Sequence, residues 1–410
     1  RRIKTWPDAS LYARARARRA APWWRKGMAG ARTLLLASLL AGCGAPRAPK
    51  RAPPARAGAA DGPWPSRGCA LGRQPLASGD HTIEVRDPAL GNITRSFVLQ
   101  VPESAATHPG GAPLLLGFHG QGGNPADFSV YLQPLTELAA LHGWVVAWPA
   151  GLREDYVKPD GGAGSDSTWN VGTAVDDATC LAGTTEVQCM ESCRKLGMCG
   201  RCNWATCYSD VDFIAHLLEH LEEGLCLDTS SFFVTGASNG GMFTHYLVQE
   251  MPGRFRAAAP VFGTPLLGYE VGSEYQLVAQ RELCSRTSLI QLHDASDTVI
   301  PWQGANSSDG WLYEPMTRTV GAWAGVHQCE SKAVPIQTPF DGGPKHVRCS
   351  EFLSCDSGGR AMYCLYDGEH GDIPEDPRGE ALMMWFFESV SRESVRRRKT
   401  RLRSATFLAP

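Results

Sequence analysis

A short glycine-rich segment, Gly236–Gly240, has the pattern Gly-x-Ser-x-Gly with Ser238 at its centre. It follows an apolar run predicted to be a strand, Ser231–Val234, and precedes a segment with helical spacing, Met242–Gln249. A serine on such a strand-turn-helix holds its hydroxyl above a sheet, and the flanking glycines avoid clashes across the turn. Ser238 is therefore predicted to be a nucleophile, and the alternative is an ordinary serine in a glycine-rich turn.

A serine hydroxyl needs a base within hydrogen-bond reach and an acid that orients this base. After a strand-turn-helix of this kind, the acid precedes the histidine in the chain. His370 is the predicted base because it lies in a turn just after the last strand-like run, whereas His245 is expected to pack in a helix and His293 to shape a loop. Asp294 and Asp297 both follow a strand-like run. Asp297 is the favoured acid, and Asp294 is the alternative.

Acyl transfer places negative charge on the carbonyl oxygen, which backbone N–H donors must stabilise. The N–H of Asn239 follows the predicted nucleophile directly. The second donor is predicted to be the N–H of Gln121, in the glycine-rich loop that follows the apolar run Leu114–Phe118. The alternative for this loop is a simple glycine turn.

Strand-like runs and segments with helical spacing alternate along the chain. The predicted buried strands are Leu114–Phe118, Trp144–Trp148, Ser231–Val234, Ala257–Phe262, Leu289–Leu292 and Ala361–Tyr366. The helical segments are Val130–Leu141, Asp210–Glu223, Met242–Gln249 and part of Trp311–Val326. His81–Val85 and Ile93–Val101 alternate apolar with polar residues and predict an antiparallel hairpin. This order predicts an α/β protein with a mainly parallel sheet.

Fourteen cysteines indicate an oxidising compartment, and six of them lie within an excursion at residues 171–208. Such a density favours disulfides over a zinc site, since only Cys199 and Cys202 have the spacing of a zinc knuckle. Without Cys43, thirteen cysteines remain. We therefore expect either one free thiol or a pair that joins two chains.

The ends of the chain carry features of export. Residues 1–27 are interpreted as an extension upstream of Met28, and residues 28–43 combine a basic start, a short apolar run and small residues, as in a secretory signal. Leu40–Cys43 resembles a bacterial lipobox, so Cys43 is a candidate lipid anchor, with a plain signal peptide as the alternative. Residues 44–66 are predicted to be a flexible linker, and residues 391–410 a basic tail.

Composition narrows the class of protein further. With 43% apolar residues the chain is not wholly disordered, and no apolar run reaches the roughly 18 residues that a membrane-spanning helix needs. Residues 1–60 carry 14 basic residues and one acid, and residues 391–410 carry seven and one, which leaves 19 basic and 40 acidic residues between them. An acidic body makes nucleic acid an unexpected partner.

Several motifs occur together in a family-like order: Gly68-Cys69, Ser78-Gly79, Gly117–Gly123, Asp210–Ile214, Leu225–Thr229, Gly236–Met242, His293–Pro301, Tyr363-Cys364 and Asp367–His370. With them, residues 67–390 resemble secreted α/β-hydrolases of the polyhydroxybutyrate depolymerase and feruloyl esterase group, known as carbohydrate esterase family one. The resemblance implies an α/β-hydrolase fold. It also implies that Ser238 is the nucleophile, His370 the general base and Asp297 its partner.

The resemblance implies an exported carboxylic ester hydrolase that works through an acyl-serine and needs no metal. Feruloyl-polysaccharide esters are the expected substrates because the segments around Cys69 and Cys226 look closest to feruloyl esterases. Polyhydroxyalkanoate or acetylated xylan is the alternative within the same chemistry. We expect Trp169, Asn170 and Trp302 to line an aromatic acyl pocket. The competing class is a non-catalytic exported binding protein on a hydrolase scaffold.

Two features depart from the family pattern. Asp294 stands where the family usually has glycine, and it is expected to add a charge near the site. The excursion at 171–208 is longer than in typical members and is expected to form a rim or lid on the active-site side of the sheet.

Overall fold

The computed structural model describes residues 64–70, 76–172, 178–184, 187–268, 286–340, 345–374 and 379–391, all within the unit Gly42–Pro410. The predictions of an upstream extension, a signal, nearly all of the linker and the basic tail lie outside the described residues, and they remain predictions.

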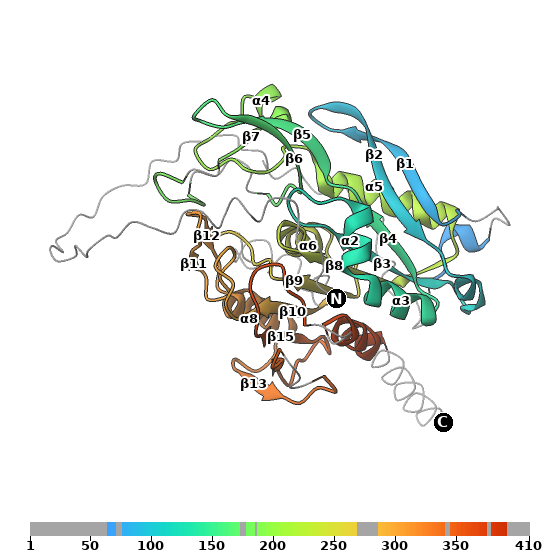
Figure 1. Ribbon diagram of the computed structural model, residues 1–410. Coiled ribbons are helices and arrows are strands. Elements are labelled where there is room, and N and C mark those ends of the chain that lie inside the picture. Colours follow the sequence, from blue (N-terminus) through green and yellow to red (C-terminus); the bar gives the residue numbers. More distant parts are fainter. Residues whose placement is uncertain are drawn as a thin grey trace, which may run out of the picture. The chain divides into compact units, whose positions relative to one another are not determined.

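A ten-stranded sheet in the order β1-β2-β4-β3-β8-β9-β10-β15-β14-β13 forms the centre of the described chain (Figure 1). Its strands are β1 (Gly79–Asp87), β2 (Gly91–Gln100), β3 (Ala112–Phe118), β4 (Val145–Pro149), β8 (Leu227–Ala237), β9 (Ala257–Val261), β10 (Ser288–Asp294), β13 (Ala333–Ile336), β14 (Arg348–Phe352) and β15 (Ala361–Tyr366). The strands from β4 to β15 pair in parallel, whereas the pairs at both ends are antiparallel. The predicted α/β-hydrolase fold is confirmed, as is the hairpin at its start.

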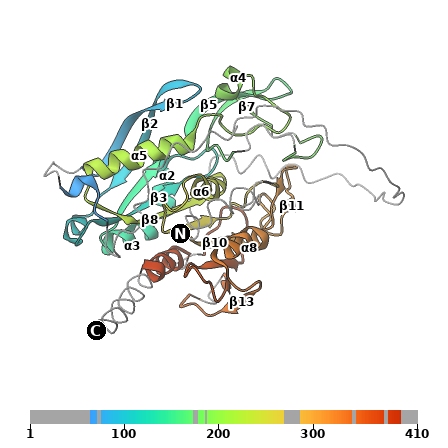
Figure 2. The ribbon, with the colours of Figure 1, turned by 180° about the vertical axis from the view of Figure 1, so that it is seen from behind.

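Helices cover both faces of the sheet because the strands are apolar on both faces. Along β3, Leu114 and Leu116 belong to one buried cluster and Leu115 belongs to the other. The first cluster includes residues of α5 (Asp210–Gly224), α6 (Asn239–Glu250) and α8 (Met316–His327), which Figure 2 shows from behind. The second includes residues of α2 (Pro125–Tyr131), α3 (Gln133–Leu141) and the helical residues 379–391. Two short 3-10 helices, η1 (Arg67–Cys69) and η2 (Glu103–Thr107), precede β1 and β3.

The helices predicted over Asp210–Glu223 and Met242–Gln249 are present with slightly longer bounds, whereas the other two predictions differ more from the structure. The single helix predicted over Val130–Leu141 is wrong, because α2 ends and α3 begins on either side of Leu132, whose backbone (φ −102°, ψ 30°) is not helical. Pro134 has no N–H to continue the ladder of hydrogen bonds, and it is tolerated because it lies in the first turn of α3. The helix in Trp311–Val326 starts only at Met316, after β11 (Ala305–Asn306) has paired with β12 (Leu312–Tyr313).

A second, three-stranded sheet contains β5 (Leu152–Val157), β6 (Ala163–Thr168) and β7 (Cys189–Met190) in the order β6-β5-β7, and the cysteine-rich excursion supplies β7. The short helix α4 (Glu191–Lys195) follows β7, and Figure 1 shows these elements together. Three disulfides brace the excursion: Cys180–Cys202, Cys189–Cys199 and Cys193–Cys207. The prediction of disulfides rather than a zinc site is therefore confirmed.

Three further disulfides, Cys69–Cys226, Cys329–Cys355 and Cys349–Cys364, bring the number among the described residues to six. The two remaining cysteines, Cys43 and Cys284, lie outside the described residues. This number of disulfides fits an extracellular protein. Within the described parts of the chain, no helix is both long and apolar enough to cross a bilayer.

Candidate active site

Ser238 occupies the sharp turn between β8 and α6. Its backbone has φ 54° and ψ −121°, a conformation that non-glycine residues rarely adopt. The turn brings backbones into close contact: a Cβ on Gly236 would lie 2.3 Å from the carbonyl oxygen of Gly240, and one on Gly240 would lie 2.1 Å from that of Phe118. Any larger residue at either glycine of the motif would therefore clash with the backbone. The strained turn holds the Ser238 side chain away from the end of the strand.

Three side chains from distant parts of the chain meet at this turn. The Oγ of Ser238 lies 3.0 Å from Nε2 of His370, and Nδ1 of His370 lies 2.8 Å from Oδ2 of Asp297. The Phe262 ring packs edge-on against the imidazole, with ring centroids 5.0 Å apart. The His370 side chain is 20% exposed and Ser238 is half-buried, whereas the Asp297 side chain has no exposed surface. The arrangement can move a proton from the serine to the histidine beside a buried negative charge.

The carboxylate of Asp297 is held by four donors. Its Oδ1 accepts the backbone N–H groups of Val299 and Ile300, both at 2.9 Å, and its Oδ2 faces His370 and also Nε2 of His293 at 3.4 Å. Burial raises the pKa of Asp297, but the hydrogen bonds from His293 and His370 outweigh burial and bring this pKa below its ordinary value. Asp297 is therefore ionised at neutral pH, as an orienting acid must be.

Asp294 lies at the end of the same strand and is in the opposite situation. Its side chain is fully buried, and neither carboxylate oxygen has a well-formed hydrogen bond to the described residues. Burial, followed by the charges of Asp297 and Asp372, raises the pKa of Asp294 to about 9. The expectation that Asp294 adds a charge near the site is wrong, because the low-dielectric surroundings keep it protonated at neutral pH.

The loop predicted to supply the second oxyanion donor lies directly against the serine. A Cβ on Gly120 would be 3.3 Å from Cβ and 3.9 Å from Oγ of Ser238. The next residue is Gln121, whose N–H was the predicted donor. Asn239 is the first residue of α6, a position where the backbone N–H has no partner within the helix. Gly120, the residue before Gln121, and Asn239 thus both lie beside the nucleophile, and the roles of the two N–H groups remain predictions.

Trp169 does not line an acyl pocket. Its side chain has no exposed surface, stacks on Phe243 with ring centroids 5.0 Å apart, and donates from Nε1 to the carbonyl oxygen of His119 at 2.9 Å. Its backbone N–H donates to Oδ1 of Asn239 at 2.7 Å. The prediction for Trp169 is corrected, because its indole packs between apolar rings and is part of the core. These two hydrogen bonds contact Asn239 and His119, one in each of the segments predicted to supply an oxyanion donor.

Asn170 and Trp302 are half-buried. Asn170 donates from its backbone N–H to Asp210 and from Nδ2 to the carbonyl oxygen of Tyr208, so its polar groups hold neighbouring loops. Trp302 donates from Nε1 to the carbonyl oxygen of Ala295, at 3.2 Å, in the segment between the two acids. Contact with a substrate remains a prediction for both residues.

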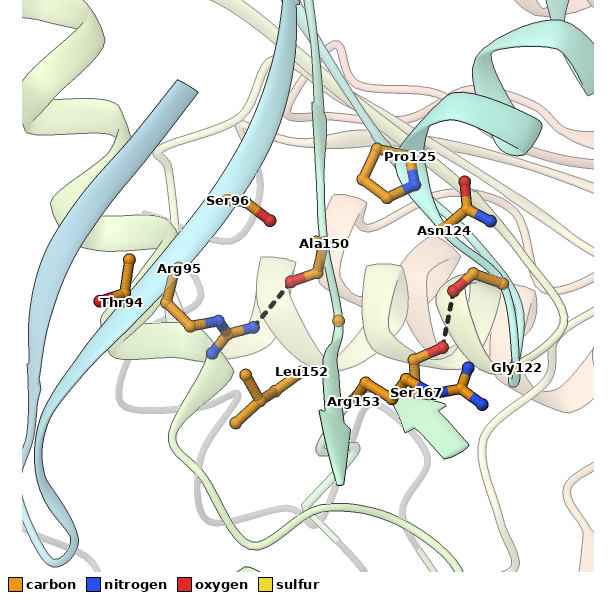
Figure 3. Close-up of a pocket in the computed structure, with 12 residues that line it drawn as sticks. Thr94, Arg95, Ser96, Gly122, Asn124, Pro125, Ala150, Leu152, Arg153 and Ser167 are labelled. Carbon is orange, nitrogen blue, oxygen red and sulfur yellow. Dashed lines mark hydrogen bonds between the residues drawn. The ribbon is translucent and has the colours of Figure 1, made fainter. Parts of the chain in front are cut away.

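A cavity of about 290 Å³ borders the oxyanion loop at Gly122 and Gly123 and is lined also by Ser167 and Arg153 (Figure 3). None of Ser238, Asp297 and His370 lines it, so it is separate from the reacting groups. In the described residues no group of three or more histidine, cysteine, aspartate or glutamate side chains is arranged to hold a metal ion.

Two contacts of the site were not anticipated from the sequence. His293 was expected only to shape a loop, and it does bind the carbonyl oxygen of Ile300 at 2.7 Å, but it also contacts Asp297. Its spacing of four residues from Asp297 was the available signal. Asp166, on β6, accepts a hydrogen bond from the side chain of Gln121 at 2.8 Å, and no motif pointed to it.

No known family profile matches the chain. It is 26% identical over 172 residues to a probable feruloyl esterase C of Aspergillus niger, covering 42% of this chain and 54% of that protein. It is 31% identical over 175 residues to a probable feruloyl esterase C of Aspergillus flavus, again covering 42% and 54%. The chain is similar to feruloyl esterases. It spans about half the length of these relatives. Among solved structures, an acetyl xylan esterase from Aspergillus awamori aligns with 76% of this chain and 99% of its own, at 16% identity and a TM-score of 0.47.

Proposed function

We propose that the chain is a serine carboxylic ester hydrolase. The observation that carries this proposal is the series of two hydrogen bonds from Ser238 through His370 to Asp297. The series joins a nucleophile, a base and an ionised acid beside two backbone N–H groups, which is the set of parts that acyl transfer needs.

In the proposed acylation step, Oγ of Ser238 attacks the ester carbonyl carbon while Nε2 of His370 takes the hydroxyl proton. The carbonyl oxygen becomes an anion and accepts hydrogen bonds from the N–H groups of Gln121 and Asn239. The carbon–oxygen bond to the alcohol then breaks, and His370 gives its proton to the departing alkoxide. Asp297 keeps the imidazole oriented and stabilises its charged form throughout.

Deacylation repeats these steps with water as the nucleophile. His370 removes a proton from a water molecule, the resulting hydroxide attacks the acyl carbon, and the proton returns to Oγ of Ser238 as the carboxylic acid leaves. The partial exposure of His370 allows water to reach the imidazole.

For the substrate we propose feruloyl esters of polysaccharides, because the relatives that match the chain are named feruloyl esterases. Acetylated xylan and polyhydroxyalkanoate are the alternative esters. Methyl ferulate, acetylated xylan and polyhydroxybutyrate given to the same enzyme sample distinguish them. A kcat/KM for methyl ferulate below that for either polymer would overturn the feruloyl assignment while leaving the hydrolase intact.

The decisive test of the reaction is Ser238→Ala on a small chromogenic ester. Removal of the nucleophile from a serine–histidine pair is expected to lower kcat about 10⁶-fold. Ser78→Ala, at an exposed serine before β1, is the matched control and is expected to retain wild-type rates. Equal rates in wild type and Ser238→Ala would remove the esterase mechanism and favour the non-catalytic binding protein.

We also propose that the chain is exported and that Cys43, in the lipobox-like segment Leu40–Cys43, carries a lipid. Expression of the full chain in a bacterium, followed by membrane fractionation of wild type and Cys43→Ala, tests the anchor. The same distribution of both proteins in the soluble fraction would favour a plain secretory signal.

A further inference from the structure

The loop that carries Gln121 is hydrogen-bonded to a strand outside the main sheet. The backbone N–H of Gly122 donates to the carbonyl oxygen of Ser167 at 2.8 Å, and Oγ of Ser167 donates to the carbonyl oxygen of Gly123 at 2.6 Å. Figure 3 shows the second of these bonds. Ser167 lies on β6, so the oxyanion loop is fixed from the three-stranded sheet and not only from its own strand, β3.

Asp166 adds a side-chain hydrogen bond to these contacts between β6 and the loop. Its Oδ2 accepts from Nε2 of Gln121 at 2.8 Å, and its Oδ1 accepts the N–H of Ser167 at 2.9 Å. A Cβ on Gly122 would lie 3.1 Å from Asp166 Oδ1, so the carboxylate also rests against the loop backbone. Oδ2 thus holds the Gln121 side chain to β6, while the bond of Oδ1 to the next residue of β6 fixes the orientation of the carboxylate.

The cysteine-rich excursion reaches the same side chain from another direction. Gln188, which is buried, accepts from Nε2 of Gln121 at 3.4 Å through its Oε1. β6 itself is paired with β5, where Glu154 accepts from the backbone N–H of Ser192 at 2.7 Å and from its hydroxyl at 3.0 Å. Ser192 directly precedes Cys193, which is bonded to Cys207. β6 is thus connected, through β5 and Glu154, to a segment that is held by a disulfide.

We infer that Asp166 is a positioning residue, which fixes the N–H of Gln121 beside Ser238 by holding the Gln121 side chain. The inference rests on the proposed function, in which this N–H stabilises the oxyanion. A donor aimed at developing charge must be held before the reaction begins, because a loop that is free to move cannot stabilise the transition state fully.

The experiment compares Asp166→Ala, Asp166→Asn, Gln121→Ala and the double variant Gln121→Ala/Asp166→Ala on a small chromogenic ester. Loss of one oxyanion donor costs about 10²–10³ in kcat, so a displaced donor is expected to lower kcat by about 10-fold or more in Asp166→Ala, with KM within about 2-fold of wild type. Asp166→Asn retains an acceptor oxygen for Gln121 and is expected to recover most of the rate.

The double variant separates positioning from general damage. Because the two residues act through one contact, the double variant is expected to be no slower than the slower single variant. Asp155→Ala, at an exposed acid on the neighbouring strand β5, is the matched control and is expected to leave kcat unchanged. A boronic acid that adds to Ser238 as a tetrahedral analogue is expected to bind Asp166→Ala more weakly by the same factor by which kcat/KM falls.

Several outcomes would overturn the inference. These are a wild-type kcat in Asp166→Ala, no recovery in Asp166→Asn, losses that multiply in the double variant, and unchanged boronate affinity. Ser238→Ala distinguishes this failure from failure of the proposed function. If Ser238→Ala is inactive and Asp166→Ala is unchanged, only the role of Asp166 is wrong, whereas an active Ser238→Ala removes the proposed hydrolase itself.

Discussion

Asp294 and Asp297 are the same residue type, three positions apart, at the carboxyl end of one strand, and both are buried. Asp297 faces two histidines and two backbone N–H groups, and its pKa is lowered. Among the described residues Asp294 has no such partners, and its pKa is raised to about 9. Burial alone therefore does not decide whether a carboxyl group is charged. The donors around it decide, since burial penalises both anions and only one is compensated.

Apart from Ser238→Ala, the largest predicted loss of rate tests the roles of the two acids directly. Asp297→Asn is expected to lower kcat about 10⁴-fold, because an amide leaves the imidazole of His370 in the wrong tautomer. Asp294→Asn, the matched variant, is expected to keep kcat within about 3-fold, since it replaces a neutral acid by a neutral amide of the same shape. Steady-state kinetics on a small ester measure both. Comparable losses of kcat in the two variants would show that the two acids do not differ in their roles.

A smaller effect is expected at the second histidine that contacts Asp297. His293→Asn is expected to lower kcat about 10-fold, because Asp297 then loses one hydrogen bond to a charged group. His327→Asn, at a buried histidine that contacts the carbonyl oxygen of Thr287 away from the site, is the control for damage to the core. If both variants lose stability by thermal unfolding but neither loses rate per folded molecule, His293 has only a structural role.

The last effect concerns the stability of the protein as a function of pH and not its rate. The pKa of Asp294 is about 9 in the folded protein and that of an unfolded aspartate is about 3.9, so the folded state holds an extra proton between these values. The contribution of this extra proton to the free energy of unfolding is present in full below about pH 3.9. It is lost as pH rises towards 9, and the free energy of unfolding falls by at most about 1.4 kcal/mol per pH unit.

Asp294→Asn lacks this proton and isolates the contribution of Asp294. Thermal unfolding from about pH 5 to 9 is expected to show a steeper fall in Tm for wild type than for Asp294→Asn. Parallel curves of Tm against pH would show that Asp294 is ionised in the folded protein, and not protonated as its raised pKa requires.

Much of the fold was predictable because its signals are local. Apolar runs such as Leu114–Phe118 mark buried strands, and all the strands predicted from the sequence are present in the sheet. Local signals were weaker at Val130–Leu141, where one proline splits the helix. They were also weaker just before the excursion, where β5 and β6 carry too few apolar residues to be recognised as strands.

Trp169 shows a different limit. Trp169 was expected to line an acyl pocket, yet its ring is enclosed by Phe118 and Phe243. Whether an aromatic ring faces a ligand or the core depends on how its strand end docks against α6. Spacing within one segment contains no information about that docking.

The sequence by itself determined the turn at Ser238, because the clash that a Cβ on Gly236 would make is with Gly240, only four residues away. The need for glycine at position 240 is tertiary, because a Cβ there would meet the carbonyl oxygen of Phe118 on β3. The sequence also determined which residue types were present to act as base and acid. Only the tertiary structure decided that Asp297 rather than Asp294 contacts His370, and that β6 holds the loop of Gln121. These choices depend on the directions of side chains at strand ends brought together over 73 and 45 residues of chain. Such directions are set by packing and register across the sheets, which act between segments and not within them.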